Sequence, residues 1–385
     1  MRKIIYLDNA STTQVDPVVF DAMKPFLTDK YGNPGTTYSF GKESRNAIDE
    51  ARVQVAEFIG ADPSQIIFTG SGTEANNLAI KMLRNPYIPP RKKIIISAIE
   101  HDSVRNSAEY LKQKCGYEVV VLGVDRNGII NDEQLRRSID DDTALLSVMF
   151  TNNEIGSFNY PICVRGHKHG ALFHCDCVQA IGQHRVNVSD YDFDSISISA
   201  HKIHGPKGVG ALYVRDKRLL EPIINGGNHQ EFGLRGGTEN VAGIVGFGKA
   251  CEVYSSDDSD RVLSLKYNFI KKMKEYVLEL GINDIFHVNA HSDVLSGKIL
   301  SVRFDNVDAE TLVLLLSTKG VFVSAGSACR SLEQEPSHVL TAIGLTPEMA
   351  RNTIRISFSK FNSEEDMSAA KTIVDAAYSL YKLTR

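Results

Sequence analysis

Between about residues 45 and 215, short apolar runs alternate with helix-forming segments, and this alternation restricts the fold more than any other feature of the chain. The runs are continuously apolar, as expected of strands that are buried on both faces. Strands that are separated by helices usually join as a parallel sheet. The pattern therefore predicts an α/β fold with a mostly parallel, seven-stranded type of sheet covered on both faces, with strands at 65–70, 92–97, 144–150, 170–176, 193–199 and 209–214.

The pattern changes after about residue 256. A polar stretch, SSDDSD (255–260), precedes a long helix pattern over 261–281. Strand candidates follow at 299–304, 320–326 and 353–358, and a terminal helix is expected from about 363. We therefore predict a large α/β domain over 14–256 and a smaller α+β domain formed by 1–13 and 257–385.

Charge and composition exclude several classes of protein. The 385 residues are 42% hydrophobic and 23% charged, with a net charge of -4, which gives no electrostatic reason to expect direct binding to nucleic acid or to an anionic membrane. No apolar run approaches the roughly 18 residues of a membrane span. The six cysteines are dispersed through a long chain, which favours reduced thiols in the cytoplasm over a disulfide scaffold.

Polar segments follow five of the expected strands directly. Ligands of open α/β sheets bind beyond the carboxyl ends of the strands. We therefore expect these segments to meet in one crevice: TGSGTEANN (69–77), EHDS (100–103), TNNEIG (151–156), CDCVQ (175–179) and AHKIHGPKG (200–208).

The first of these segments is suited to an anion. Gly70, Gly72 and Thr73 open a helix, where small residues let backbone N–H groups approach a ligand and the helix end carries partial positive charge. The alternative is a plain strand-to-helix connection. The segment lacks the lysine of a nucleotide P-loop and the full dinucleotide fingerprint.

Lys202 and Asp176 narrow the class of ligand. A lysine in a glycine-rich loop is usually a solvated charge, but at a strand end it is suited to forming a Schiff base. Asp176 ends an apolar strand between two cysteines, where it either caps a helix starting at Val178 or holds the protonated ring nitrogen of a pyridine cofactor. A phosphate cradle, a Schiff-base lysine and a ring-binding aspartate together predict pyridoxal 5'-phosphate.

Other polar residues are suited to the same cofactor. His101 is a candidate to stack on the ring and move protons, or else a histidine at a helix start. Gln179 is a candidate donor to the phenolic oxygen, Asn153 a candidate partner of cofactor or substrate, and Arg355 a bidentate clamp for a carboxylate or an ordinary surface arginine. HCDC (174–177) is not expected to bind a metal, because alternate strand residues point to opposite faces and no second ligand pair has suitable spacing.

Cys329 stands in SAGSACR (324–330), among small residues rather than the bulky ones that surround a packed cysteine. The segment predicts a mobile loop. Its thiol is therefore either a bystander or a reactive group that must move.

These motifs together resemble the cysteine desulfurases, in the class V aminotransferase branch of the fold-type I pyridoxal-phosphate enzymes. The resemblance covers nearly the whole chain. It is carried by YLDNASTT (6–13), YGNPGTT (31–37), TGSGTEANNLAI (69–80), EHDSV (100–104), NNEIG (152–156), FHCDCVQAIG (173–182), SISAHKIHGPKGVGALYV (197–214), RGGTEN (235–240), SAGSACRS (324–331) and IRISF (354–358).

The resemblance implies a role for each site residue. Lys202 would be the Schiff-base lysine and His101 the stacking acid–base, with Asp176 and Gln179 holding the ring. Cys329 would take the sulfur of L-cysteine as a persulfide, alanine would be released, and the sulfur would pass to an acceptor or scaffold protein. The remaining implied residues are Thr73, Ser199 and His201 at the phosphate, Thr238 reaching in from the partner subunit of a homodimer, and Asn33 and Arg355 at the substrate carboxylate.

Rival functions stay open at this point. A selenocysteine lyase or another class V enzyme such as an aminotransferase would share the fold, although an aminotransferase needs no thiol. A catalytically weak scaffold for sulfur-acceptor proteins is a third alternative. The acceptor itself is open among iron–sulfur cluster assembly, tRNA thiolation, cofactor synthesis and DNA phosphorothioation.

The chain also departs from the family pattern. The segment over 157–169 is shorter than expected, and Cys175 and Cys177 flank Asp176 where smaller or β-branched residues are usual. Tyr38 stands where a histidine is common, and SFSK (357–360) stands where a glycine–arginine pair often follows.

Overall fold

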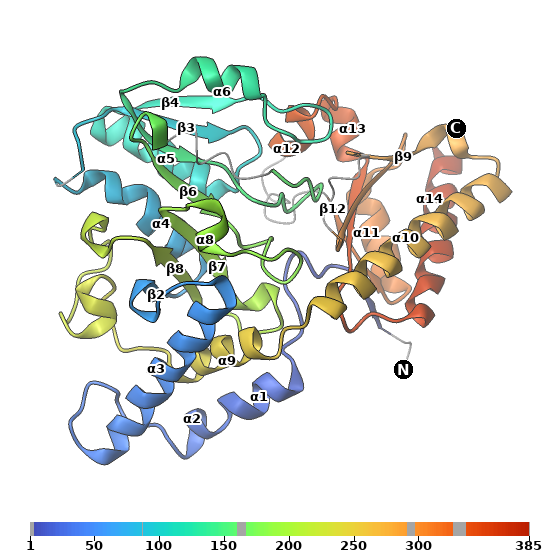
Figure 1. Ribbon diagram of the computed structural model, residues 1–385. Coiled ribbons are helices and arrows are strands. Elements are labelled where there is room, and N and C mark those ends of the chain that lie inside the picture. Colours follow the sequence, from blue (N-terminus) through green and yellow to red (C-terminus); the bar gives the residue numbers. More distant parts are fainter. Residues whose placement is uncertain (1–3, 87, 160–166, 291–296, 326–335, 385) are drawn as a thin grey trace.

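The computed structural model describes residues 4–86, 88–159, 167–290, 297–325 and 336–384. Its largest sheet has seven strands in the order β2-β8-β7-β6-β5-β3-β4 (Figure 1). Only β8 runs antiparallel to its neighbours in this sheet, so the other strands point their carboxyl ends toward one edge. The strands are β2 (Ile66–Thr69), β3 (Lys93–Ser97), β4 (Glu118–Leu122), β5 (Thr143–Ser147), β6 (Leu172–Asp176), β7 (Ser195–Ser199) and β8 (Gly210–Val214).

Helices cover both faces of this sheet, as the continuous apolar runs predict. Ile66 and Phe68 of β2 lie in one core cluster, with α3 (Ser39–Ile59) and α9 (Val241–Glu252). The intervening Ile67 lies in another cluster, with α4 (Gly72–Lys81) and α5 (Asp102–Cys115). Successive side chains of a strand point to opposite faces, so a run of apolar residues supplies two cores at once. The predicted α/β class and mostly parallel sheet are confirmed.

A second, four-stranded antiparallel sheet has the order β12-β13-β10-β9. Alternate residues of its strand β13, such as Ile354 and Ile356, enter a core with α10 (Ser256–Glu279), α11 (Ala309–Thr318) and α14 (Ala369–Leu383). By the same alternation Arg355 is directed to the opposite face of the sheet. The strands are β9 (Phe286–Val288), β10 (Ile299–Phe304), β12 (Ser324–Ala325) and β13 (Thr353–Ser357).

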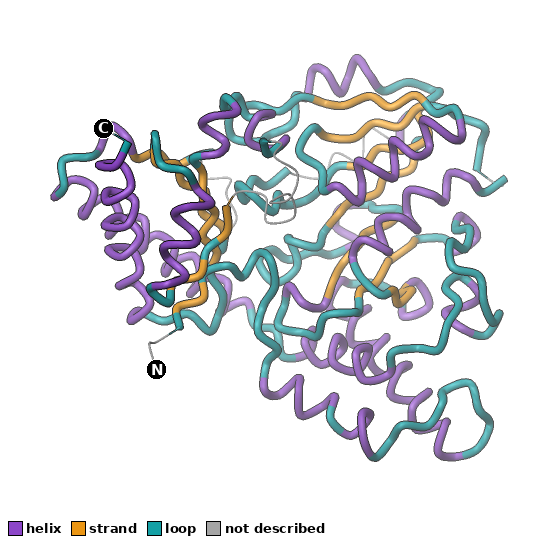
Figure 2. The backbone as a smooth tube through the Cα atoms, turned by 180° about the vertical axis from the view of Figure 1, so that it is seen from behind, coloured by secondary structure: helices purple, strands orange, loops and turns teal. Residues whose placement is uncertain are grey.

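The N-terminal segment joins the two sheets. The strand β1 (Ile5–Tyr6) pairs in parallel with β11 (Val321–Phe322), and Asp8 bridges Ser357. Figure 2 shows this end of the chain beside the smaller sheet. The predicted division into domains at 14–256 and 257–385 stays a prediction. The remaining helices are α1 (Pro17–Met23), α2 (Pro25–Thr28), α6 (Asp132–Ser138), α8 (Val188–Tyr191), α12 (His338–Ala342) and α13 (Pro347–Arg351).

Three strands, β1, β4 and β9, were not expected from the sequence. The strand β1 has only two residues. The strand β4 ends the large sheet and carries the exposed Glu118, so its pattern is less apolar than that of the buried strands. The strand β9 is short and only partly buried. Among the described helices, none is both long enough and apolar enough to cross a membrane.

Candidate active site

The carboxyl-end edge of the large sheet borders a cavity of about 1220 Å³, including its open mouth. All five strand-end segments contribute to its wall, as predicted, and the smaller sheet contributes Arg355. The residues that line it are Ala10, Ser11, Ser71, Gly72, Thr73, Asn76, His101, Asp102, Ser103, Met149, Asn153, Glu154, Asp176, Val178, Gln179, Ser199, His201, Lys202, His338 and Arg355.

The N-terminus of α4 supplies the part of the wall that is suited to an anion. Ser71 caps the helix by accepting a hydrogen bond from the Glu74 amide, and the first-turn residues Gly72 and Thr73 line the cavity. The first amides of a helix have no carbonyl partner within it, so they are available to a bound anion. A Cβ atom on Gly72 would lie 2.6 Å from Cγ2 of Val178, so only glycine lets the helix start this close to the strand-end loop.

Asp176, the last residue of β6, is a buried carboxylate in the same cavity. Its Oδ2 accepts from Nδ2 of Asn76 at 2.7 Å, and its Oδ1 accepts from the Val178 amide at 2.9 Å. Among the described residues no lysine or arginine forms an ion pair with it. A buried carboxylate without a protein cation is suited to a cationic ligand atom such as a protonated pyridine nitrogen. Asp176 thus combines the turn-capping contact with the geometry expected of a cofactor ligand.

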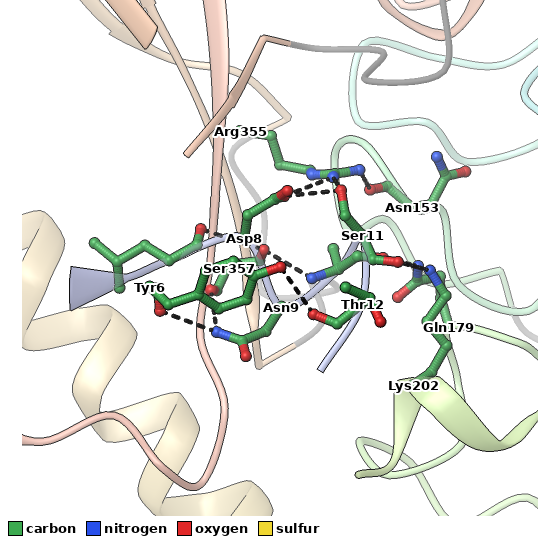
Figure 3. A network of polar contacts seen from close by, with 12 residues as sticks. Tyr6, Asp8, Asn9, Ser11, Thr12, Asn153, Gln179, Lys202, Arg355 and Ser357 are labelled. Atoms are coloured by element: carbon green, nitrogen blue, oxygen red, sulfur yellow. Dashed lines mark hydrogen bonds and ion pairs between the residues drawn. The ribbon is translucent and has the colours of Figure 1, made fainter. Parts of the chain in front are cut away.

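Lys202 lies in the short 3₁₀ turn Ala200–Lys202 that follows β7. Its Nζ donates to the carbonyl oxygens of Ala10 at 2.6 Å and Ser11 at 2.8 Å (Figure 3). Gln179 donates to the same Ala10 oxygen at 2.8 Å, while its own Oε1 is buried without a partner among the described residues. The amine, the amide and the Asp176 carboxylate therefore surround one space. These groups fit pyridoxal phosphate.

His101 caps α5 and lines the cavity. Its Nδ1 accepts from the Ser103 amide at 3.1 Å, which leaves Nε2 as the nitrogen available to a ligand. The neighbouring Glu100 is fully buried, and burial raises the pKa of its carboxyl to about 8. His101 can therefore cap the helix through Nδ1 and still contact a ligand through Nε2.

Two further predicted phosphate ligands lie near Lys202. Ser199 ends β7 and lies in the cavity wall. His201 shares a hydrogen bond with Oγ1 of Thr12 at 3.1 Å through its Nδ1. Burial, with the charges of nearby lysines including Lys202, lowers the pKa of His201 to about 4, so the ring is neutral at neutral pH and can present one N–H.

Arg355 connects the smaller sheet to the cavity. Its guanidinium donates to the Asn153 carbonyl at 2.7 Å, to Oδ1 of Asp8 at 2.9 Å and to Oγ of Ser11 at 2.6 Å (Figure 3). Its Nε is buried without a partner among the described residues. Arg355 is therefore not a surface arginine. It is a buried cation aimed at the cavity, and it is paired with a carboxylate of the N-terminal segment.

Two of the described residues that were predicted for the site, Asn33 and Thr238, are not part of this wall. Asn33 is exposed between α2 and α3, where its Oδ1 accepts from the Gly35 amide at 2.8 Å. Thr238 lines a separate hollow with Gly70 and Gly208. Cys329 lies outside the described residues.

Four residues that line the cavity or hold Arg355 were not singled out from the sequence. Asn76 and His338 line the cavity, and Asp8 and Ser11 hold Arg355. Asp8 and Ser11 both occur in the motif YLDNASTT, which carried the resemblance but was given no chemical role.

Comparison with known proteins agrees with this geometry. The family described as aminotransferase class-V matches residues 5–369. The chain is 40% identical over 380 residues to the cysteine desulfurase IscS of Dictyoglomus turgidum, covering 97% of this chain and 94% of that protein. A solved NifS-like protein superposes with a TM-score of 0.88 at 34% identity, covering 99% of this chain and all 100% of that one. A solved structure of SspA in complex with cysteine superposes with a TM-score of 0.79 at 35% identity, covering 93% of this chain and 99% of that one.

Proposed function

Because the chain belongs to the class V aminotransferase family and, within it, to the pyridoxal-phosphate-dependent cysteine desulfurases, we propose that its cavity takes sulfur from L-cysteine and delivers it to Cys329. The observation that carries this proposal is the position of three groups around one cavity: the Lys202 amine, the Asp176 carboxylate and the Arg355 guanidinium.

Each part of the cofactor has a matching group. The first turn of α4, with Ser199 and His201, would hold the phosphate. Asp176 would hold the protonated ring nitrogen, Gln179 the ring oxygen, and His101 would lie against the ring. Lys202 would bind the cofactor covalently. When bound, pyridoxal phosphate withdraws electrons from the α-carbon of the amino acid.

Arg355 is suited to the carboxylate of the substrate. A planar guanidinium holds a carboxylate through two parallel hydrogen bonds, which orients the molecule as well as binding it. In this structure Asp8 takes one of those positions, and the Nε of Arg355 remains without a partner among the described residues. A cysteine carboxylate bound there would therefore compete with Asp8 or share the guanidinium with it.

The described residues on either side of the cysteine segment lie beside residues that line the cavity or line it themselves. Ser324 of β12 is in register with Arg355, and Ala325 is the last residue before the undescribed stretch. On the other side His338 lines the cavity and bonds the Glu100 carbonyl through Nε2 at 2.9 Å. Cys329 follows Ala325 by four positions, which sets an upper limit of ~14 Å on the distance between their α-carbons. This limit on chain length supports the proposal that Cys329 acts at this cavity.

The proposed sulfur transfer balances without an added oxidant or reductant. Lys202, once free of the cofactor, takes the α-proton of cysteine. The Cys329 thiolate attacks the substrate Sγ, so that an S–S bond forms while the Cβ–Sγ bond breaks. The electron pair of the broken bond goes to the β-carbon, which takes up the proton that the substrate thiol has given up. Lys202 returns the α-proton, and the product leaves as alanine. Cys329 is left as a persulfide.

We further propose a homodimer that passes this sulfur to an acceptor protein. Thr238 and Asn33 fall outside the cavity wall of a single chain, which is expected if they serve the site of a partner subunit. The described cysteines Cys115, Cys175, Cys177 and Cys251 are free, which supports a reducing compartment such as the cytoplasm.

Peptide mapping tests the proposal. After borohydride reduction of the yellow holoenzyme, the pyridoxyl group should be found on the peptide that contains Lys202. After brief exposure to L-cysteine and alkylation, the peptide that contains Cys329 should gain the mass of one sulfur atom. A pyridoxyl label at another lysine, or persulfide sulfur on another cysteine, would contradict the assignment. Repeating the experiment with L-selenocysteine separates the desulfurase from a selenocysteine lyase, which would act on that substrate alone.

A further inference from the structure

A second cavity, of about 600 Å³ including its opening, is also lined by Lys202. It lies among the turn after β7, the helix α10 and the sheet residues around β13, and it is lined in part by His204, Tyr254, Asp258, Lys298 and Lys360. Lys202 therefore lies in the walls of two cavities. The second of these contains a lysine, Lys298, that has no part in the chemistry proposed above.

Lys298 is held firmly at the start of β10. Its amide donates to Oε1 of Gln183 at 3.3 Å, and its carbonyl accepts from the Phe358 amide at 2.9 Å. The residue is only 5% exposed. Within the described ranges, its ammonium has no hydrogen bond and no ion pair. Burying a cation without a partner costs free energy, so its position calls for an explanation.

The charges that act on Lys298 come from the cations Lys202 and Arg355, whereas the histidines that interact with it are neutral at neutral pH, because burial lowers the pKa of each to about 4. These histidines are His184, His201 and His204. The nearby acidic groups do not neutralise Lys298. Asp16 pairs with Lys360 at 2.7 Å, and Asp8 pairs with Arg355 at 2.9 Å. Asp258 on α10 is half-buried in the cavity wall and forms no ion pair with Lys298.

The charges of Lys298 and Lys202 therefore oppose each other. Burial, followed by the charges of Lys202 and Arg355, lowers the pKa of Lys298 to about 7. Coupling between two titrating groups is mutual, so a proton on Lys298 must make a proton on Lys202 equally less favourable.

We propose that Lys298 acts through Lys202: its ammonium, held on the wall of a shared cavity, discourages a proton on the Lys202 nitrogen and keeps that nitrogen able to act as a base near neutral pH. The inference rests on the proposed function, in which Lys202 carries the cofactor and takes the substrate proton. It adds a residue that lines the second cavity and does not line the cofactor cavity.

A pH titration of the holoenzyme tests this inference. The visible absorption of cofactor bound to Lys202 changes when the Lys202 nitrogen gains or loses a proton, so the midpoint reports on that proton directly. We expect the midpoint of K298M to lie about 0.5–1 pH unit above that of the wild type, as expected when a neighbouring cation is removed. K298R, which keeps the charge, should stay close to the wild type.

The matched control is Lys266 on α10. It is as buried as Lys298, at 3% exposed, and burial lowers its pKa to about 8. K266M should leave the midpoint unchanged. A wild-type midpoint in K298M, with a thermal unfolding curve that shows a folded protein, would overturn the inference. Absence of a lysine-bound cofactor band in the wild type would instead overturn the proposed function.

Discussion

The two walls of the active-site cavity are built in different ways. On the large-sheet wall each group lies at a strand end or shortly after one, and Asp176 at the end of β6 is bonded by Asn76 of α4, the helix that follows β2. On the small-sheet wall Arg355 lies in the middle of a strand, and its partners Asp8, Ser11 and Asn153 come from distant parts of the chain. The cofactor groups therefore all come from segments of one sheet, although Lys202 and Gln179 also bond the N-terminal segment, whereas the substrate wall depends on how the two sheets are joined.

The largest effect is expected on the cofactor wall. K202A should lose at least ~10⁴-fold in the rate of alanine formation, because both the covalent attachment and the base are removed. The lysine-bound absorption band should disappear with it. K207A removes an exposed lysine of the same loop and should retain most of the activity. Similar losses in the two variants would show that the loop charge, and not the Lys202 amine, matters.

Loss of Arg355 from the substrate wall should raise KM for L-cysteine more than it lowers kcat. R355A is expected to raise KM for L-cysteine by about 100-fold, which is the loss of a bidentate charged contact, and to leave the cofactor spectrum unchanged. The control is R303A on the neighbouring strand β10, where the guanidinium pairs with Asp305 at 2.6 Å. An unchanged KM in R355A would remove Arg355 from the substrate site.

Replacing Asp8 should change KM for L-cysteine less than replacing Arg355 does. Because its carboxylate occupies Arg355 at 2.9 Å, the substrate carboxylate has to compete with it. D8N removes the competing charge but keeps a hydrogen-bonding oxygen, and we expect KM to fall about 3-fold. A rise in KM would show that Asp8 orients Arg355 for the substrate rather than competing with it. Steady-state kinetics with L-cysteine separate the two outcomes.

The large-sheet wall was the more predictable of the two. Ile66, Ile67 and Phe68 show in one short run that both faces of the strand are buried, and the rule that ligands bind at strand ends then brings Asp176, Lys202 and His101 together. The edge strand β4 was not predicted, because a strand at the edge of a sheet can carry exposed polar residues, such as Glu118, in place of a continuous apolar run.

The small-sheet wall was predictable only in part. The chemistry of Arg355 indicated a carboxylate clamp, but its pairing with Asp8 depends on a parallel contact between β1 and β11, which lie more than 300 residues apart in the sequence. No local pattern encodes such a contact. Asn33 and Thr238 were assigned through the resemblance alone, Asn33 to the substrate carboxylate and Thr238 to the site of a partner subunit, and both roles stay predictions.

The smallest expected effect is on the free energy of unfolding, through the buried carboxyl of Glu100 next to the cavity residue His101. Burial raises the pKa of Glu100 from 4.5 to about 8, so the native state holds a proton that the unfolded chain releases between these values. The stability that this proton contributes is present below about pH 4.5 and is lost as the pH rises toward 8. The free energy of unfolding of E100Q, relative to the wild type, should therefore rise by on the order of 1–3 kcal/mol between about pH 5 and pH 8.

Urea denaturation at the two pH values measures this change. The exposed Glu118 on β4 provides the control, since E118Q should follow the wild type at both pH values. A constant difference between E100Q and the wild type would mean that Glu100 is ionised in the folded protein.

The central claim is that the cofactor wall and the substrate wall cooperate to place sulfur on Cys329. Its most direct test compares alanine and sulfide release from L-cysteine, in the presence of a reductant, by the wild type and by C329A. The account predicts nearly equal alanine and sulfide from the wild type, and little of either from C329A although its cofactor remains bound. Wild-type release of both products by C329A would contradict the account, because the sulfur would then leave the substrate without Cys329.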